Sequence, residues 1–347
     1  MKKKILFIIN PISGTVSKAG IPDAIDKYLD KETFDYRIAN TQHPGHATDL
    51  ARQAANDGYD VVVAIGGDGT VNEVGRGITH TNTAMAIIPC GSGNGLARHL
   101  LIPMNVKKSL DIINKCVTKA LDYGVINDHE FFCTCGMGFD AFISFKFAET
   151  GKRGPITYVQ QILEKGLGYK PETYEINVDE GTENFKAFLI SCANASQYGN
   201  NAYIAPQASM SDGMLDVVIM EPFDLIEAPQ IAIDMFSKTL NKSSRIKSFR
   251  TKHLRVHRST PGPIHYDGEP VMTGTDIDIH LKAGGIKVVI NPEGDRDARR
   301  PNAIQSTAAD LFNQLSGIHD DIMKRTRRGM NLTKILQKKI EENLPSI

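Results

Sequence analysis

The chain lacks the features that would place it outside the cell or across a membrane. Its five cysteines are odd in number and unevenly spread, so they do not suggest a disulfide framework. The N-terminal lysines are followed only by the apolar run from Ile5 to Ile9, which is too short for a signal peptide or a spanning helix. We therefore expect a cytoplasmic protein with reduced thiols and no membrane span.

The chain also lacks net charge, since 40 basic residues balance 40 acidic ones. No overall electrostatic footprint therefore argues for a nucleic-acid partner. What the chain does have is length and apolar content: 347 residues with 41% hydrophobic side chains can bury a sizeable core. About two domains are expected from that length.

Residues 1–125 alternate short apolar runs with helical stretches, which predicts an α/β domain with a parallel sheet. In such a sheet, ligands bind at the carboxyl ends of the strands. The apolar runs that we expect to be strands are Ile5–Ile9, Tyr36–Ala39, Val61–Ile65 and Met85–Ile88.

Residues 126–291 carry closely spaced strand patterns such as Phe131–Cys135, Ala187–Ala193 and Met214–Met220. Only one convincing helix, Ile156–Leu167, interrupts them. Strands without intervening helices predict an antiparallel second domain, either a sandwich or an open barrel. The hinge between the two domains is expected near Asp122–Val125.

Residues 292–347 form a C-terminal extension with two helical patterns, Ala308–Lys324 and Leu332–Glu342. The first is amphipathic, so it needs a partner for its apolar face. It could pack back on the first domain, join a second subunit to give a homodimer, or lie on a membrane surface. Packing within the chain is the interpretation that we favour.

Polar or glycine-rich turns follow all four expected strands of the first domain. Glycines let backbone N–H groups approach a polyphosphate with no Cβ in the way, and the carboxyl ends of parallel strands share one sheet edge. The sequence therefore predicts a nucleotide site there. The turns are Asn10-Pro11-Ile12-Ser13-Gly14, then Thr41 with Gly45 and His46, then Gly66-Gly67-Asp68-Gly69-Thr70 with Asn72 and Glu73, and then Gly91-Ser92-Gly93-Asn94.

None of these turns matches the common phosphate-binding templates. A Walker A loop needs Gly-Lys-Ser/Thr, which no turn supplies. The dinucleotide fingerprint would need glycine at Asn72 or at Leu96 and fails at both positions. The spacing of Gly91-Ser92-Gly93 is not that of a nucleophile elbow. A phosphate site of another design is required.

Taken together, the motifs resemble the diacylglycerol kinase catalytic-domain superfamily, which includes soluble bacterial lipid kinases and the sphingosine and ceramide kinases. The match runs in the family order from residue 10 to about residue 294. The matching pieces are Asn10-Pro11-x-Ser13-Gly14, Thr41 with His46-Ala47, Gly66 through Thr70 with Asn72-Glu73, Pro89-x-Gly91-Ser92-Gly93-Asn94 with Ala97-Arg98, Gly136 through Asp140, Ser211 through Asp216, and Asp267-Gly268-Glu269.

The resemblance implies a two-domain kinase that binds ATP between an α/β domain of the NAD kinase/diacylglycerol kinase type and a β-rich, sandwich-like domain. It also implies a structural Mg²⁺ loop at Ser209, Asp212 and Met214, with the Asp212 carboxylate and the backbone carbonyls of the other two as oxygen ligands of the kind that Mg²⁺ prefers. The residues that it places at the nucleotide are Asn10, Pro11, Ile12, Ser13, Gly14, Thr41, Gly66, Gly67, Asp68, Gly69, Thr70, Asn72, Glu73, Gly91, Ser92, Gly93 and Asn94.

Phosphoryl transfer to an alcohol needs charge neutralisation at the phosphates and a carboxylate within reach of the hydroxyl proton. Asp68 is suited to organise Mg²⁺ directly or through water. Glu269 is our first choice for the base, with Asp267 as the alternative. Cations for the transferred phosphate are sought among Arg98, Lys152 and Arg153.

The expected acceptor is a lipid hydroxyl, either of diacylglycerol or of a sphingoid or ceramide lipid. The fourth turn resembles the sphingoid and ceramide kinase form more than the Gly-Thr-x-Asn-Asp-Phe form of many bacterial diacylglycerol kinases. Phenylalanines near Gly136–Asp140 could line an apolar channel or simply form core. They are Phe139, Phe142, Phe145 and Phe147.

Two other functions stay open at this stage. The Gly-Gly-Asp-Gly-Thr turn also resembles NAD kinases, although the second domain shows only Asn194 to Asn201 where those enzymes carry a Thr-Pro-Thr-Gly-Ser-Thr type segment. A non-catalytic nucleotide or lipid sensor would keep the fold, but its usual mark, loss of the key acids, is absent. A lipid kinase would also need a transient contact with the membrane surface.

Overall fold

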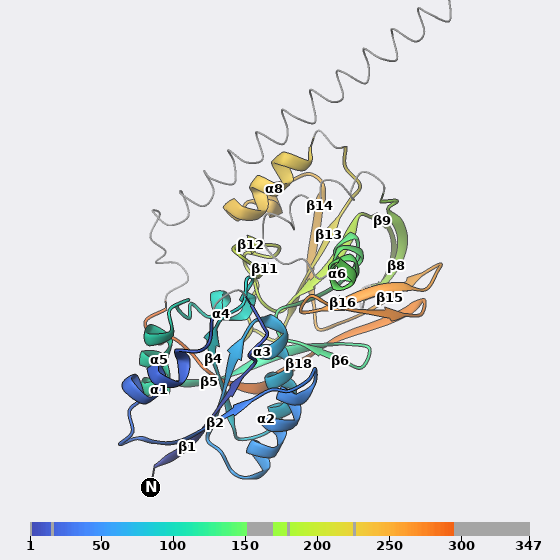
Figure 1. Ribbon diagram of the computed structural model, residues 1–347. Coiled ribbons are helices and arrows are strands. Elements are labelled where there is room, and N and C mark those ends of the chain that lie inside the picture. The colour runs from blue at the N-terminus through green and yellow to red at the C-terminus, as the bar shows by residue number, and fades with distance from the viewer. Residues whose placement is uncertain (1, 15–16, 151–168, 179–180, 225–226, 295–347) are drawn as a thin grey trace, which may run out of the picture.

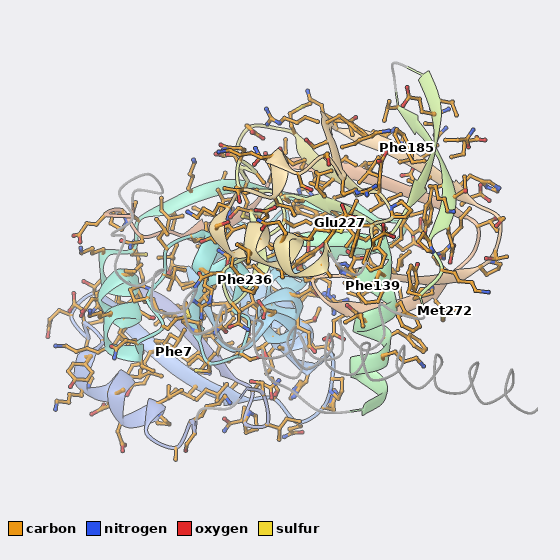
Figure 2. The ribbon with its side chains drawn as sticks, turned by 90° about the horizontal axis from the view of Figure 1, so that it is seen from above. Phe7, Phe139, Phe185, Glu227, Phe236 and Met272 are labelled. Carbon is orange, nitrogen blue, oxygen red and sulfur yellow. The ribbon has the colours of Figure 1, made fainter. Side chains whose placement is uncertain are left out.

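The computed structural model describes residues 2–14, 17–150, 169–178, 181–224 and 227–294. An α/β part and a β-rich part lie side by side, with helix α3 close to where they meet (Figure 1). Figure 2 shows Phe7 in the first part and Phe139 in the second. The expected helices 156–167, 308–324 and 332–342 lie outside the described residues.

The first sheet begins with parallel strands in the order β2-β1-β3-β4, which confirms the expected parallel sheet. Ile9 pairs with Ile65, and Ile65 pairs with Ile88, so the carboxyl ends of the strands are level. The strands are β1 (Lys3–Ile9), β2 (Phe34–Asn40), β3 (Val61–Gly66) and β4 (Ala84–Pro89).

Helices cover both faces of this sheet, which explains its continuous apolar strands. On β1, Phe7 packs in the cluster with α1 (Ile21–Tyr28) and α5 (Val106–Lys115). Its neighbour Ile8 packs in the opposite cluster, with α2 (His46–Asn56) and α3 (Asp68–Ile78). The period-2 alternation of a strand thus separates the two halves of the core.

One long strand, β18 (Asp276–Val289), links the two parts of the molecule. Lys287 and Val288 pair with β4 in parallel, while most of β18 pairs antiparallel with β5 (Thr118–Ile126). The sheet continues through antiparallel strands of the β-rich part. They are β15 (His253–Arg258), β8 (Glu172–Val178) and β9 (Gly181–Ala187), while β6 (His129–Phe131) pairs with β5.

A second, antiparallel sheet packs against the antiparallel strands of the first sheet, and the two sheets share one hydrophobic core. The β-rich part is therefore a sandwich and not an open barrel. Met137 and Val217 of the second sheet meet Leu254 and Ile279 of the first. In order, the strands of the second sheet are β14 (Ile246–Thr251), β13 (Leu215–Met220), β10 (Leu189–Ala193), β7 (Thr134–Gly138), β16 (Gly262–Tyr266) and β17 (Glu269–Thr273).

Helical elements cover the outer face of the second sheet. Phe139 of α6 (Phe139–Thr150) and Ile231 of α8 (Ala228–Ser237) share a cluster with Leu189. The remaining short elements are α4 (Gly95–His99), β11 (Gln197–Gly199), β12 (Ala202–Tyr203) and the 3₁₀ turn Leu240–Lys242. The expected hinge at 122–125 lies within β5, and the domain boundaries at 125 and 291 stay predictions.

Candidate active site

Three of the predicted turns touch through their backbones. A Cβ built at Gly91 would lie 2.4 Å from Cα of Gly67, which joins the third turn to the fourth. A Cβ at Gly14, where φ is +69°, would lie 1.9 Å from the carbonyl oxygen of Cys90, which joins the first turn to the fourth. These contacts leave no room for a side chain, so the glycines are required for packing between turns.

The second turn is attached through Glu73 on α3. One carboxylate oxygen of Glu73 accepts the Gly45 N–H at 3.0 Å, and the other accepts the Ala47 N–H at 3.1 Å. A carboxylate is favourable at the N-terminus of a helix, here α2. Glu73 therefore holds the second turn in place, and its contact with a nucleotide stays a prediction.

Asp68 joins the third turn to the fourth. Its Oδ2 accepts the Asn94 N–H at 2.8 Å, and its Oδ1 accepts the Gly95 N–H at 2.6 Å. Burial raises the pKa of this carboxyl above its ordinary value, while the two N–H groups oppose the shift. The Asp68 carboxylate thus caps the short helix α4, and its expected work on Mg²⁺ stays a prediction.

Other predicted residues shape the turns from within. The Asn94 side chain closes the fourth turn by accepting the Gly91 N–H at 2.9 Å and donating to the Gly91 carbonyl at 2.7 Å. The Asn10 Nδ2 donates to Thr70 Oγ1 at 3.1 Å, which links the first turn to the third. The buried members of the predicted set are Ser13, Thr41, Gly66, Thr70, Asn72 and Asn94. The members with at least part of their surface exposed are Asn10, Pro11, Ile12, Gly14, Gly67, Asp68, Gly69, Glu73, Gly91, Ser92 and Gly93.

Glu269 brings an exposed carboxylate from the second sheet to the third turn. It lies at the start of β17, and a Cβ built at Gly69 would stand 3.0 Å from its Oε1. Gly69 follows Asp68 directly at the N-terminus of α3. The structure therefore brings Glu269 and the acidic glycine turn together, while the role of Glu269 as a base stays a prediction.

Asp267, two residues earlier, has a different environment. Its Oδ1 accepts the N–H groups of Cys133 and Thr134, at 2.7 Å and 3.1 Å. Its Oδ2 accepts the Phe132 N–H and the Asn72 Nδ2, both at 2.9 Å. Burial raises the pKa of Asp267, and these donors oppose the shift. A carboxylate with four donors is suited to holding a turn, so the geometry favours Glu269 as the base.

In the predicted Mg²⁺ loop, the Asp212 carboxylate already has partners within the protein. One oxygen of Asp212 pairs with the Arg250 guanidinium, and the other accepts the Met214 N–H at 3.2 Å. The Arg250 guanidinium supplies positive charge at the single carboxylate of the set (Ser209, Asp212, Met214), and Mg²⁺ binding through that carboxylate and the backbone carbonyls of Ser209 and Met214 stays a prediction. Among the residues that the structure describes, no group of three or more His, Cys, Asp or Glu side chains could hold a metal.

One cation near the site, Lys18, was missed from the sequence, whereas Arg98 was among the candidates. Lys18 donates from Nζ to the Ser13 carbonyl and so brings a cation to the first turn. Its position four residues after Gly14 was the available signal. Arg98 donates from Nε to the Gly93 carbonyl at 3.0 Å, and burial lowers its pKa. Lys152 and Arg153 lie outside the described residues.

An aromatic cluster lies on the outer face of the second sheet, beside the start of α6. The Phe139 ring centroid is 4.4 Å from that of Phe188 and 5.3 Å from that of Tyr169. Phe142 contacts the same group and is half-buried, as is Phe145. The side chain of Phe147 lies outside the described residues. Phe139 and Phe188 are buried in the core cluster of this face, and Phe142 packs against that cluster from its edge.

Comparison with known proteins identifies the class. Residues 4–126 match the diacylglycerol kinase catalytic domain, and residues 134–290 match the YegS C-terminal NAD kinase beta sandwich-like domain. A solved diacylglycerol kinase from Bacillus anthracis has the same fold, with a TM-score of 0.67, 23% identity, and coverage of 84% of this chain and 97% of that one. A second solved chain from that organism gives a TM-score of 0.69 at 23% identity, over 84% of this chain and 98% of that one.

The chain belongs to the diacylglycerol kinase catalytic-domain superfamily. A diacylglycerol kinase of Staphylococcus saprophyticus is 27% identical over 78% of this chain and 90% of its own length. One from Staphylococcus aureus strain Newman is 28% identical over 78% of this chain and 87% of its own length. An uncharacterised Synechocystis protein is 26% identical over 77% of this chain, and the match spans 65% of that protein.

Proposed function

We propose that this protein is an ATP-dependent lipid kinase that transfers the γ-phosphate of ATP to a lipid hydroxyl, diacylglycerol being the first candidate acceptor. The observation that carries the proposal is the approach of the Glu269 carboxylate to Gly69 in the glycine turn. An acid from one sheet thereby lies close to the glycine turn that we expect to bind phosphate. The names of the staphylococcal relatives support the same acceptor.

The reaction needs little covalent chemistry from the protein. Backbone N–H groups of the turns and the nearby Lys18 and Arg98 would bind and orient the triphosphate. Glu269 would accept the proton of the acceptor hydroxyl as its oxygen attacks the γ-phosphorus and ADP leaves. Mg²⁺, when bound with ATP, would neutralise phosphate charge.

The acceptor has to come from a bilayer. Among the described residues, no helix is long and apolar enough to cross a membrane. We therefore propose a reversible contact of the protein with the membrane surface, with the lipid tails near the half-buried ring of Phe142. Co-sedimentation with liposomes that contain anionic lipid should reveal this contact, and absence of binding with or without anionic lipid would contradict it.

The test is incubation of the purified protein with radiolabelled ATP and, in parallel, diacylglycerol, monoacylglycerol, a sphingoid base, ceramide or NAD. Label in the organic phase supports a lipid kinase and identifies the acceptor. Label on NAD would instead favour the NAD kinase function, and no transfer to any acceptor would favour a sensor.

Glu269→Gln is the matched variant for this assay. Loss of a general base costs about 10²–10⁴-fold in rate, so we expect kcat to fall at least about 100-fold. Because Glu269 is exposed, the free energy of unfolding should change little. A near-normal kcat would remove Glu269 from the reaction.

A further inference from the structure

A buried chain of polar side chains runs behind the candidate base. His265 on β16 contacts Asp140 at the start of α6, with 3.0 Å between Nε2 and Oδ2. Their side chains are only 3% and 6% exposed. The Tyr198 hydroxyl on β11 donates to the same Asp140 oxygen at 3.1 Å, and the Ala141 N–H donates to Oδ1 at 2.8 Å. None of these side chains has a part in the reaction as proposed above.

The bond at the other ring nitrogen favours one tautomer of His265. The Gly268 N–H donates to Nδ1 at 3.4 Å, a long hydrogen bond that favours the tautomer in which Nδ1 carries no proton and Nε2–H donates to Asp140. The contact between His265 and Asp140 also requires a glycine at position 136 on β7. A Cβ built at Gly136 would lie 2.5 Å from Asp140 Oδ2 and 3.0 Å from His265 Nε2.

Through the bond to the Gly268 N–H, the His265 ring contacts the turn that directly precedes Glu269. Asp267 and Gly268 both have left-handed backbone angles, with φ of 48° and 86°. Asp-Gly with both residues at positive φ is the favoured two-residue loop between paired strands, here between Tyr266 and Glu269, and hydrogen bonds to neighbouring elements fix how this loop is oriented. The Asp267 N–H donates to the Thr134 carbonyl at 2.8 Å, and the Gly268 N–H donates to His265.

Tyr198, at the other end of this hydrogen-bond network, lies next to the fourth turn. Tyr198 is followed by Gly199, where a Cβ would lie 2.8 Å from Cα of Gly93. The Asn200 N–H donates to the Gly93 carbonyl at 3.0 Å. The polar side chains thus connect the edge expected to hold phosphates with the turn before the base.

We propose that His265 is a positioning residue that, held by Asp140 and Tyr198, fixes the Gly268 amide and thereby the direction of the Glu269 carboxylate. The inference rests on the proposed function. Its physical basis is that a reacting group misplaced by about 1 Å can cost on the order of 100-fold in rate. A role in stability alone would require only the buried bond between His265 and Asp140.

Two substitutions separate these roles, because each retains one half of the imidazole. In His265→Gln, the amide nitrogen can reach the Nε2 position and donate to Asp140, but the Gly268 N–H loses its acceptor. In His265→Asn, the amide oxygen can take the Nδ1 position and accept from Gly268, but Asp140 loses a donor. His257→Gln on β15 is the control, since His257 is exposed and pairs with Asp276 outside the site.

We expect His265→Gln to lower kcat about 10-fold or more while the KM for ATP changes by less than about twofold. His265→Asn should retain more of kcat than His265→Gln. It should nevertheless unfold at a lower denaturant concentration than His265→Gln, because Asp140 loses a donor. Tyr198→Phe should lower kcat less than His265→Gln, and the control should match the wild type. Equal kcat in the Gln and Asn variants, or kcat loss that simply follows stability, would overturn the proposal.

Two measurements do not depend on activity. Ring ¹⁵N spectra should show His265 with an unprotonated Nδ1 and a protonated Nε2, and the opposite tautomer would overturn the proposal. The Gly268 amide should lose hydrogen-exchange protection in His265→Gln and retain it in His265→Asn. If the wild type transfers no phosphate, the proposed function fails, while these spectra still decide whether His265 holds the turn.

Discussion

Replacing Asp267 by Asn distinguishes an acid that holds the structure from an acid that reacts. Each oxygen of Asp267 accepts two N–H donors, and an Asn side chain turns one of these oxygens into an NH₂ group. Two donors then face another donor and lose their partner. A hydrogen bond to a charged group contributes about 1.5–3 kcal/mol, so the loss of two should cost the variant about 3–6 kcal/mol of unfolding free energy.

The loss should appear in urea denaturation and as a fall in Tm of about 4–8 °C for a protein of this size. Asp276→Asn is the matched control, because Asp276 lies on β18 with a side chain that is 83% exposed. Its unfolding free energy should stay within about 0.5 kcal/mol of the wild type.

Activity gives the second half of the test. Glu269→Gln should lose turnover with little loss of stability, whereas Asp267→Asn should lose both together. If Asp267→Asn unfolded within about 0.5 kcal/mol of the wild type and still lost turnover, its carboxylate would not be held as described. The base would then be Asp267.

Further predictions concern the turns, the pH dependence, the acceptor and the loop at Asp212. Gly91→Ala should weaken ATP binding and lower Tm because its Cβ would meet Gly67, whereas Gly20→Ala, with no atom within 4 Å, should leave both unchanged; equal binding in the two variants would refute the packing argument. Burial raises the pKa of Asp68, so its contribution to stability is present at low pH and is lost as the pH rises through the folded pKa. In urea unfolding, Asp68→Asn should therefore be more destabilising, relative to the wild type, near pH 4 than at neutral pH, and a difference independent of pH would contradict the shift. Phe142→Ser should raise KM more for a long-chain than for a short-chain diacylglycerol in the kinase assay, and equal effects would place the tails elsewhere. Arg250→Ala should lower Tm, and added Mg²⁺ should restore Tm only if the freed Asp212 loop can bind it; a wild type that Mg²⁺ itself stabilises without nucleotide would contradict the assigned guanidinium.

Local signals explain why much of the fold could be predicted. The apolar runs at Ile5–Ile9 and Val61–Ile65 are followed at once by turn residues, and both are strands of the parallel sheet. Glycine at Gly14 and Gly91 marked the turns correctly. The physical reason differs in part from the predicted one, because these glycines also allow one turn to pack against another.

The side-chain partners could not be predicted, because they depend on contacts between distant parts of the chain. His265 and Asp140 are 125 residues apart, and no sequence pattern links them. In the sequence, Asp267 and Glu269 are two acidic residues of one short turn, and nothing in the sequence distinguishes their roles. Only the folded backbone shows that four N–H groups surround the first, while the second lies exposed beside Gly69.

The long strand β18 limits how the molecule can move during turnover. It is one hydrogen-bonded element that borders β4 in the α/β part and β15 in the β-rich part. A wide swing of one part away from the other would have to break that ladder. We therefore expect ATP to enter and ADP to leave through twisting of a continuous sheet and rearrangement of surface segments, with the two halves remaining joined throughout the catalytic cycle.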